Sequence, residues 1–242
     1  MEKDSPAARL ALVGGALCLD FANTVGNHNT DHSSEHLTSY ADLVTWSLHA
    51  NILDAPTAQR MLRDAARQPT AARNVLRNAR ALREALYRIF VARAQNASPQ
   101  AQDLETLTRA NANAFEHTRI IWDGKNFAWD WEDEITLDRM IWSIARSAAD
   151  LLTMSNLDRV KQCGGYACGW LFLDTSKNQS RRWCAMNDCG NRAKVRRFYT
   201  RLRAVVKSKQ RDSIHDSNLR NSITRSTHTR ARRDHSHRAR RH

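Results

Sequence analysis

Residues 161–203 read KQCGGYACGWLFLDTSKNQSRRWCAMNDCGNRAKVRRFYTRLR and hold four of the five cysteines of the chain. Cys163 and Cys168 are separated by four residues, fifteen residues follow, and Cys184 and Cys189 are again separated by four. This spacing suits tetrahedral zinc, because each close pair reaches one edge of the ion from a tight turn. Four thiolates fill the coordination sphere, so the sequence predicts one structural Zn²⁺ ion with no open position for water.

The segment around these cysteines also predicts a local fold. An apolar run, residues 170–173, and a second candidate strand, residues 181–184, flank a polar turn, residues 174–180, which predicts a hairpin. After Cys189 the apolar residues recur at near-helical spacing and basic residues fill the other positions. This pattern predicts a basic amphipathic helix that starts at the last ligand. Together the knuckle, hairpin and helix indicate a treble-clef-like zinc finger.

Several strings in the chain resemble a known family. CGNR at residues 189–192, RRWC at 181–184 and LFLDTS at 171–176 are similar to the CGNR-type zinc finger. GALCLDFANTV at residues 15–25 is similar to the start of the ABATE domain. That helical module precedes such fingers in bacterial proteins described as stress-induced transcription regulators. The resemblance covers nearly all of the chain up to about Lys207, and it implies that all four paired cysteines are zinc ligands.

Basic residues are concentrated in the last third of the chain. The whole chain has 38 basic and 25 acidic residues, a net charge of +13. Residues 1–158 carry 16 basic and 20 acidic residues, whereas residues 159–242 carry 22 and 5. A positive charge segregated in this way predicts a polyanionic partner for one part of the chain, and nucleic acid is favoured over an anionic membrane surface.

The chain is expected to be mainly α-helical and to have three parts. Residues 1–158 are predicted to form an ABATE-like helical domain with a small β-hairpin, residues 159–207 the zinc finger, and residues 208–242 a disordered basic tail with too few apolar residues to offset its chain entropy. Helices are expected over about residues 38–50, 57–67, 71–95, 98–114 and 136–154, and hairpin strands over residues 118–122 and 127–131.

The composition also bears on the location of the protein. No stretch approaches the roughly 18 consecutive apolar residues of a membrane-spanning helix, so no membrane association is expected. The apolar run at residues 10–19 follows an acidic rather than a basic start, which argues against a signal peptide. Paired thiols with metal spacing and one further cysteine, Cys18, favour a reducing cytoplasm over a disulfide scaffold.

Three polar residues of the first part are candidates for a ligand pocket: Asp20, Asn23 and Arg83. Local capping of backbone groups is the plainer interpretation for Asp20 and Asn23. Arg83 lies beside apolar positions of the 71–95 helix, where a buried guanidinium needs an acidic partner or a ligand. The resemblance to the ABATE domain implies a ligand- or stress-sensing unit. We therefore expect this part to bind a small-molecule effector or a second subunit as a homodimer.

The chain shows no phosphate-binding glycine loop, no GxSxG and no HExxH, so we predict that it is not an enzyme. The predicted function is a zinc-dependent, DNA-binding transcriptional regulator. Asn191 and Arg192 are the candidates for base contacts, because Asn suits adenine and Arg suits guanine. In the alternative, an RNA-binding or protein-interaction accessory protein, Trp170, Trp183 and Tyr199 stack on unpaired bases. The candidate nucleic-acid contacts are Arg181, Arg182, Asn191, Arg192, Lys194, Arg196, Arg197 and Arg201.

Overall fold

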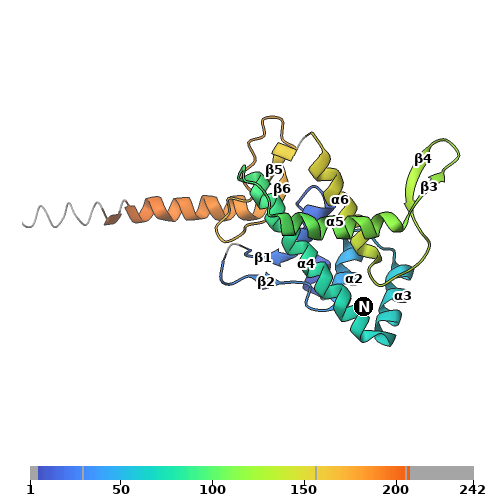
Figure 1. Ribbon diagram of the computed structural model, residues 1–242. Helices are drawn as coiled ribbons and strands as arrows, with labels where there is room; N and C mark the ends of the chain where they lie inside the picture. Colours follow the sequence, from blue (N-terminus) through green and yellow to red (C-terminus); the bar gives the residue numbers. More distant parts are fainter. Residues whose placement is uncertain (1–4, 29, 156, 205, 208–242) are drawn as a thin grey trace, which may run out of the picture. The chain divides into compact units, whose positions relative to one another are not determined.

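The structure is a computed structural model that describes residues 5–28, 30–155, 157–204 and 206–207 (Figure 1). The chain divides into two compact units, Met1–Gly190 and Asn191–His242. The basic tail predicted for residues 208–242 lies outside the described residues. Among the helices that the structure describes, none is long and apolar enough to cross a membrane.

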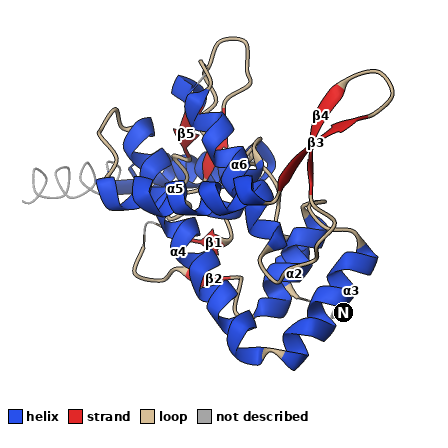
Figure 2. Cartoon of the chain, turned by 45° about the vertical axis from the view of Figure 1, so that its right-hand side comes forward, coloured by secondary structure: helices blue, strands red, loops and turns tan. Residues whose placement is uncertain are grey.

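The first unit is built mainly from helices, with three small antiparallel sheets among its described residues (Figure 2). The α-helices are α1 (Leu17–Ala22), α2 (Tyr40–His49), α3 (Ala55–Arg67), α4 (Pro69–Ala94), α5 (Ala101–Glu116) and α6 (Arg139–Thr153). The short helical turns are η1 (Pro6–Arg9), η2 (Leu157–Arg159) and the π-helical η3 (Met186–Gly190). The strand pairs are β1 (Val25–Gly26) with β2 (Ser34–Glu35), β3 (Thr118–Trp122) with β4 (Phe127–Trp131), and β5 (Val160–Gln162) with β6 (Leu171–Leu173).

Local sequence signals account for most of these elements. At the start of α2 the Ser39 side chain accepts a hydrogen bond from the backbone N–H of Asp42, and the Asp42 carboxylate accepts one from the N–H of Ser39. This capping box satisfies two backbone donors at the exposed helix end. The hairpin predicted at residues 118–122 and 127–131 forms with those bounds. Its Asp123 carboxylate accepts the backbone N–H groups of Lys125 and Asn126 in the turn.

Some helix starts differ from the expected ones. α5 was expected to begin at Ser98 but begins at Ala101, because Gln100 still has an extended backbone and no side chain caps the helix. The Ser98–Pro99 pair extends the chain here instead of opening the helix, as proline disfavours helical geometry in the residue before it. α6 was expected to begin at about residue 136 but begins at Arg139. Asp138 takes the cap position, and the Thr136 hydroxyl donates to its carboxylate.

Helix α4 lies at the centre of the core of the first unit. It contacts α1, α2, α3 and α5, and also β5 and β6. Its apolar stripe, including Leu82, Leu86 and Phe90, is buried. The same hydrophobic cluster contains Val160 of β5 and Leu171 of β6, both almost fully buried. The segment that carries the cysteines therefore shares the main core with the helices.

The strand pairing of this segment corrects the predicted hairpin. β6 pairs with β5, with Lys161 opposite Phe172, and residues 181–184 form no strand. Pairing with β5 places Val160 in the core, which a pairing with residues 181–184 would not do. The first compact unit continues past residue 158 to Gly190. The domain boundary predicted at residue 158 therefore stays a prediction about the sequence modules.

Candidate metal centre

The first cysteine pair lies in the turn between β5 and β6. Cys163 follows β5 directly, and Cys168 is joined to β6 through Gly169 and Trp170. The φ of Gly169, 71°, falls in the left-handed region that glycine adopts readily. A side chain at Gly165 would place its Cβ 3.0 Å from the Sγ atom of Cys189 and 3.3 Å from that of Cys163. The glycines of the C-x4-C motif therefore let the backbone turn close around the sulfur atoms.

The second pair is carried by a different kind of turn. Cys184 precedes η3, and Cys189 lies within it. The backbone N–H of Gly190 donates to the carbonyl of Ala185 at 3.1 Å, which closes this wide turn. Both sulfur-bearing side chains are buried. The π-helical turn thus directs Cys184 and Cys189 toward the first pair.

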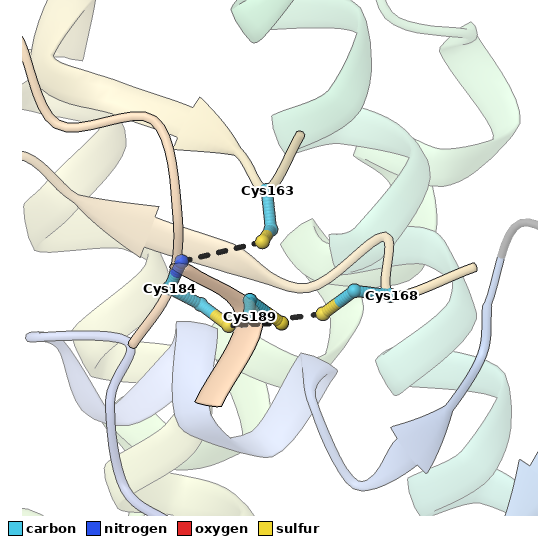
Figure 3. Close-up of side chains that lie close together, drawn as sticks. All are labelled: Cys163, Cys168, Cys184 and Cys189. Carbon is cyan, nitrogen blue, oxygen red and sulfur yellow. Dashed lines mark hydrogen bonds between the residues drawn. The ribbon is translucent and has the colours of Figure 1, made fainter. Parts of the chain in front are cut away.

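The four sulfur atoms form one compact cluster (Figure 3). All lie within 4.8 Å of one another. The Sγ atoms of Cys168 and Cys184 are 3.7 Å apart, as are those of Cys184 and Cys189. Zinc–thiolate bonds of about 2.3 Å at tetrahedral angles require sulfur–sulfur separations of about 3.8 Å. These donors and separations suit the binding of one zinc ion with no position left for water.

The electrostatics of the cluster favour a divalent cation. The Cys163 sulfur accepts backbone N–H groups from Gly165 at 3.4 Å and Cys184 at 3.3 Å. Hydrogen bonds from the thiols of Cys168 and Cys184 lower the pKa of Cys163 to about 2, and the bond to Cys163 raises the pKa of Cys168 to about 12. Ionisation of one thiol therefore opposes ionisation of its neighbours, and binding of a dication is expected to release protons.

Comparison with known families agrees with this centre. The sequence model of the ABATE family, described as "Putative stress-induced transcription regulator", matches residues 15–155, more than half of the chain. The chain belongs to the ABATE family. The model of the CGNR zinc finger matches residues 159–202, which include all four cysteines. Both are regulator and zinc-finger families rather than enzyme families. No curated protein matches the chain.

Asp174, in the LFLDTS string of this ABATE protein, holds together segments that flank the two cysteine pairs. It was not selected as a site residue from the sequence. Its buried carboxylate accepts hydrogen bonds from Lys161 Nζ at 2.7 Å, from the backbone N–H and hydroxyl of Ser176, and from the backbone N–H of Arg181 at 2.9 Å. Burial alone would raise the pKa of Asp174, but these donors outweigh it and lower the pKa. The sequence signal that could have identified Asp174 is a single acidic residue directly after the apolar run at residues 170–173.

Arg181, predicted to contact nucleic acid, makes structural contacts that were not predicted from the sequence. Its guanidinium donates to the backbone carbonyls of Trp183, at 2.9 Å, and Cys184, and it lies 4.5 Å from the centre of the Phe172 ring. It thereby satisfies carbonyl groups beside the metal ligands. The other predicted nucleic-acid contacts have exposed side chains: Arg182, Asn191, Arg192, Lys194, Arg196, Arg197 and Arg201.

Asn23 connects the helical part of the ABATE protein to the zinc finger. Its buried side-chain amide donates to the carbonyl of Leu171 at 2.8 Å, and its carbonyl accepts the Leu171 backbone N–H at 2.8 Å. Nearby, the Trp170 indole N–H donates to the carbonyl of Val25 at 2.8 Å. These bonds link residues almost 150 positions apart, so Asn23 and Trp170 both serve the packing of the finger against α1 and β1.

Arg83 lines a cavity whose lining does not include Asp20 or Asn23. The Arg83 side chain is almost fully buried and makes two hydrogen bonds of 2.7 Å to the Glu35 carboxylate, with Glu84 beside it. These contacts outweigh the effect of burial and lower the pKa of Glu35. The cavity has a volume of about 330 Å³ and is lined by Val25, His28, Thr30, Ser33, Glu35, Arg83 and Glu84.

Asp20 closes a turn instead. Its carboxylate accepts the backbone N–H of Gly14 at 2.7 Å, and burial raises its pKa to about 6. An acid with a raised folded pKa costs stability above that pKa and costs nothing below its unfolded pKa.

We therefore expect Asp20→Asn to stabilise the protein at pH 8, by at most about 3 kcal/mol, because an amide oxygen still accepts from Gly14 without a buried charge. The gain in melting temperature should decline between about pH 6 and pH 4. Thermal unfolding of both proteins across this range measures it, and a difference that grows toward acid pH would show that the carboxylate is not held at a raised pKa.

Proposed function

We propose that this protein is a zinc-dependent, DNA-binding transcriptional regulator. The observation that carries the proposal is the basic helix that follows the metal centre in sequence. Residues 191–204 are helical and begin two positions after Cys189. Residues 191–207 contain seven Lys and Arg and no acidic residue. Side chains of this kind neutralise phosphates and release counterions from duplex DNA, which favours association at low salt.

The first turn of this helix is the candidate reader of sequence. Asn191 and Arg192 are exposed, and their side chains suit the major-groove edges of adenine and guanine. The backbone N–H of Gly190, just before this turn, donates to the carbonyl of Ala185 and is not available to a phosphate. Zinc would act on this surface indirectly, by fixing the π-helical turn that precedes the helix.

We expect Arg192→Ala and Asn191→Ala to weaken binding to the preferred duplex by about 1–3 kcal/mol and to weaken binding to random duplex much less. Arg203→Ala, later in the same helix, is the matched control. A phosphate contact there should weaken both duplexes equally and reduce the salt dependence by about one ion. A chain ending at Lys207 should likewise lose affinity for every duplex by a similar factor.

Binding isotherms of these four proteins on both duplexes, at several salt concentrations, measure the difference. Equal losses on preferred and random DNA for the Asn191 and Arg192 variants would show that the helix contacts phosphates only. No detectable binding of the wild-type protein to any duplex would remove the proposal.

RNA binding is the second candidate, because exposed aromatic residues lie among the arginines of this helix. Phe198 and Tyr199 are each more than half exposed, and such rings stack on unpaired bases. Competition between duplex DNA, single-stranded RNA and heparin for the zinc-loaded protein separates the two functions. Preference for single-stranded RNA, lost on Tyr199→Ala, would favour RNA; preference for one DNA duplex would exclude it.

We also propose that the ABATE domain senses a small-molecule effector, and that the protein acts in the cytoplasm, where reduced thiols persist. The cavity at Arg83 supports an effector, because it is concave and its lining includes the buried, charged side chain of Arg83. A ligand of the folded state raises the melting temperature with the logarithm of its concentration. A metabolite screen should find such a compound, and Ser33→Ala should weaken its effect. A screen without any shift would count against sensing at this cavity.

A further inference from the structure

The hairpin β3–β4 exposes an unusual amount of apolar surface. Ile120, Trp122, Phe127 and Trp129 are between 56% and 76% exposed. Ile120 lies opposite Trp129 and Trp122 opposite Phe127 in the strand register. Side chains of directly opposed residues lie on one face of a sheet, and alternate residues share that face. These four residues therefore form one continuous surface, which we call the aromatic face.

The aromatic face is held in place at its base and free at its tip. At the base, Trp129 meets Phe115 of α5 edge to face, and Arg146 of α6 lies 5.8 Å from the centre of the Trp129 ring. Near the tip, Trp122 contacts Phe127 with ring centroids 4.9 Å apart. Both views show the hairpin standing clear of α5 and α6 (Figure 1, Figure 2). An exposed aromatic surface on a fixed support is typical of an interaction site.

Charge restricts the kind of partner. Residues 118–134 contain two basic and five acidic residues, which disfavours nucleic acid and anionic membranes. The charged pair within the strands, Arg119 and Asp130, lies opposite each other in the register, on the face away from the aromatic residues. The aromatic face itself carries no ionisable side chain. Packing it against an identical face would therefore bury no charge from these four residues, and Arg146 at its base keeps its ion pair with Asp150 at 2.9 Å.

The area of the face also fits a second copy. Covering one aromatic side chain removes about 150–250 Å² of accessible surface, so the exposed parts of these four residues and Phe115 amount to roughly 500 Å² per copy. Two such faces bury about 1,000 Å² in total, the lower limit for a specific interface. A two-fold interface brings the same patch together from both subunits and therefore requires a self-complementary surface. An apolar face meets this requirement, because apolar side chains pack favourably against apolar side chains.

We propose that this chain forms a homodimer in which the aromatic faces of two β3–β4 hairpins pack against each other around a two-fold axis. The interface is small and apolar, with a dissociation constant on the order of micromolar. Its residues lie outside the metal centre and the basic helix, so dimerisation is independent of DNA binding.

Sedimentation of the full-length, zinc-loaded protein over concentrations spanning the micromolar range tests this. The wild-type chain should pass from monomer to dimer. Trp122→Ser combined with Phe127→Ser should raise the dissociation constant on the order of a hundredfold or more, because central aromatic residues dominate such interfaces. Met154→Ser removes an equally exposed apolar side chain outside the hairpin and should leave the dimer unchanged. Lys125→Ser, in the hairpin turn but not on the face, should do the same.

Hydroxyl-radical footprinting of the wild-type protein provides a second measurement that does not depend on folding of the variants. Trp122, Phe127 and Trp129 should become protected as the concentration rises, while exposed Met154 and Tyr166 should not. A monomer at all concentrations would overturn the proposal, whether the face is covered by another segment of this chain or by a different protein. A dimer that survives the double substitution, or unchanged labelling of the face, would overturn it equally.

Discussion

Replacing Cys184 by Ser is expected to abolish zinc binding and to unfold the segment around the metal centre. Binding of zinc to a four-thiolate site contributes about 10 kcal/mol or more, and this becomes folding free energy where the site does not form without metal. Metal analysis should fall from one equivalent of zinc to none. Limited proteolysis should then cut first within residues 161–190, and the melting temperature of the helical part should fall too, because Val160 and Leu171 belong to its core.

Cys18→Ala is the matched control for this experiment. Cys18 is also fully buried, but it lies outside the cluster of four sulfur atoms, and burial raises the pKa of its thiol to about 12. This variant should lose some stability through the smaller side chain and keep one equivalent of zinc. Wild-type protein purified without stoichiometric zinc, or a Cys184→Ser variant that keeps it, would show that the four-cysteine site is wrongly assigned.

The second large effect is expected from Asn23→Ala. The substitution leaves the buried N–H and C=O of Leu171 without partners, and each unsatisfied group costs about 1–3 kcal/mol. The finger should separate more readily from α1, so transfer of zinc to a chelator should become faster while the zinc stoichiometry stays at one. Denaturant unfolding and the rate of zinc transfer measure the two consequences.

A graded series makes this test specific. Asn23→Asp keeps an acceptor for the Leu171 N–H but buries a carboxylate whose second oxygen faces the Leu171 carbonyl, so at neutral pH it should be no more stable than the alanine variant. At acid pH the protonated acid both accepts and donates, so the stability of this variant should rise above that of the alanine variant. Asn113→Ala removes one hydrogen bond, to Asp138, at a site that does not touch the finger. It should leave zinc transfer unchanged. Equal acceleration in the Asn113 and Asn23 variants would mean that general destabilisation, not the link to Leu171, controls access to the metal.

Much of the fold could be predicted because the relevant signals are local. The apolar stripe of α4, the capping box at Ser39 and the turn at Asp123 each act within a few residues. The pairing of β6 was predicted wrongly because β5 is only three residues long, and its reason for pairing is the burial of Val160 in a core built from distant helices. No local pattern contains that information.

The candidate site shows the same division. The spacing of the four cysteines identified the ligand cluster, since metal geometry constrains sequence spacing directly. The direction of Arg181 could not be predicted, because it depends on carbonyl groups of Trp183 and Cys184 that only the folded turn leaves in need of donors. Asp20, Asn23 and Arg83 were grouped by polarity beside apolar residues. In the structure they serve a turn, a link between segments and a cavity, respectively.

Selection of genomic DNA fragments by the purified, zinc-loaded protein tests most directly whether the finger reads DNA. We predict that one sequence is enriched and is bound about a thousandfold more tightly than random duplex at physiological salt, and that removing zinc with a chelator abolishes this preference. Equal affinity for selected and random fragments, or an unchanged preference after zinc removal, would contradict a zinc-dependent regulator that recognises DNA sequence.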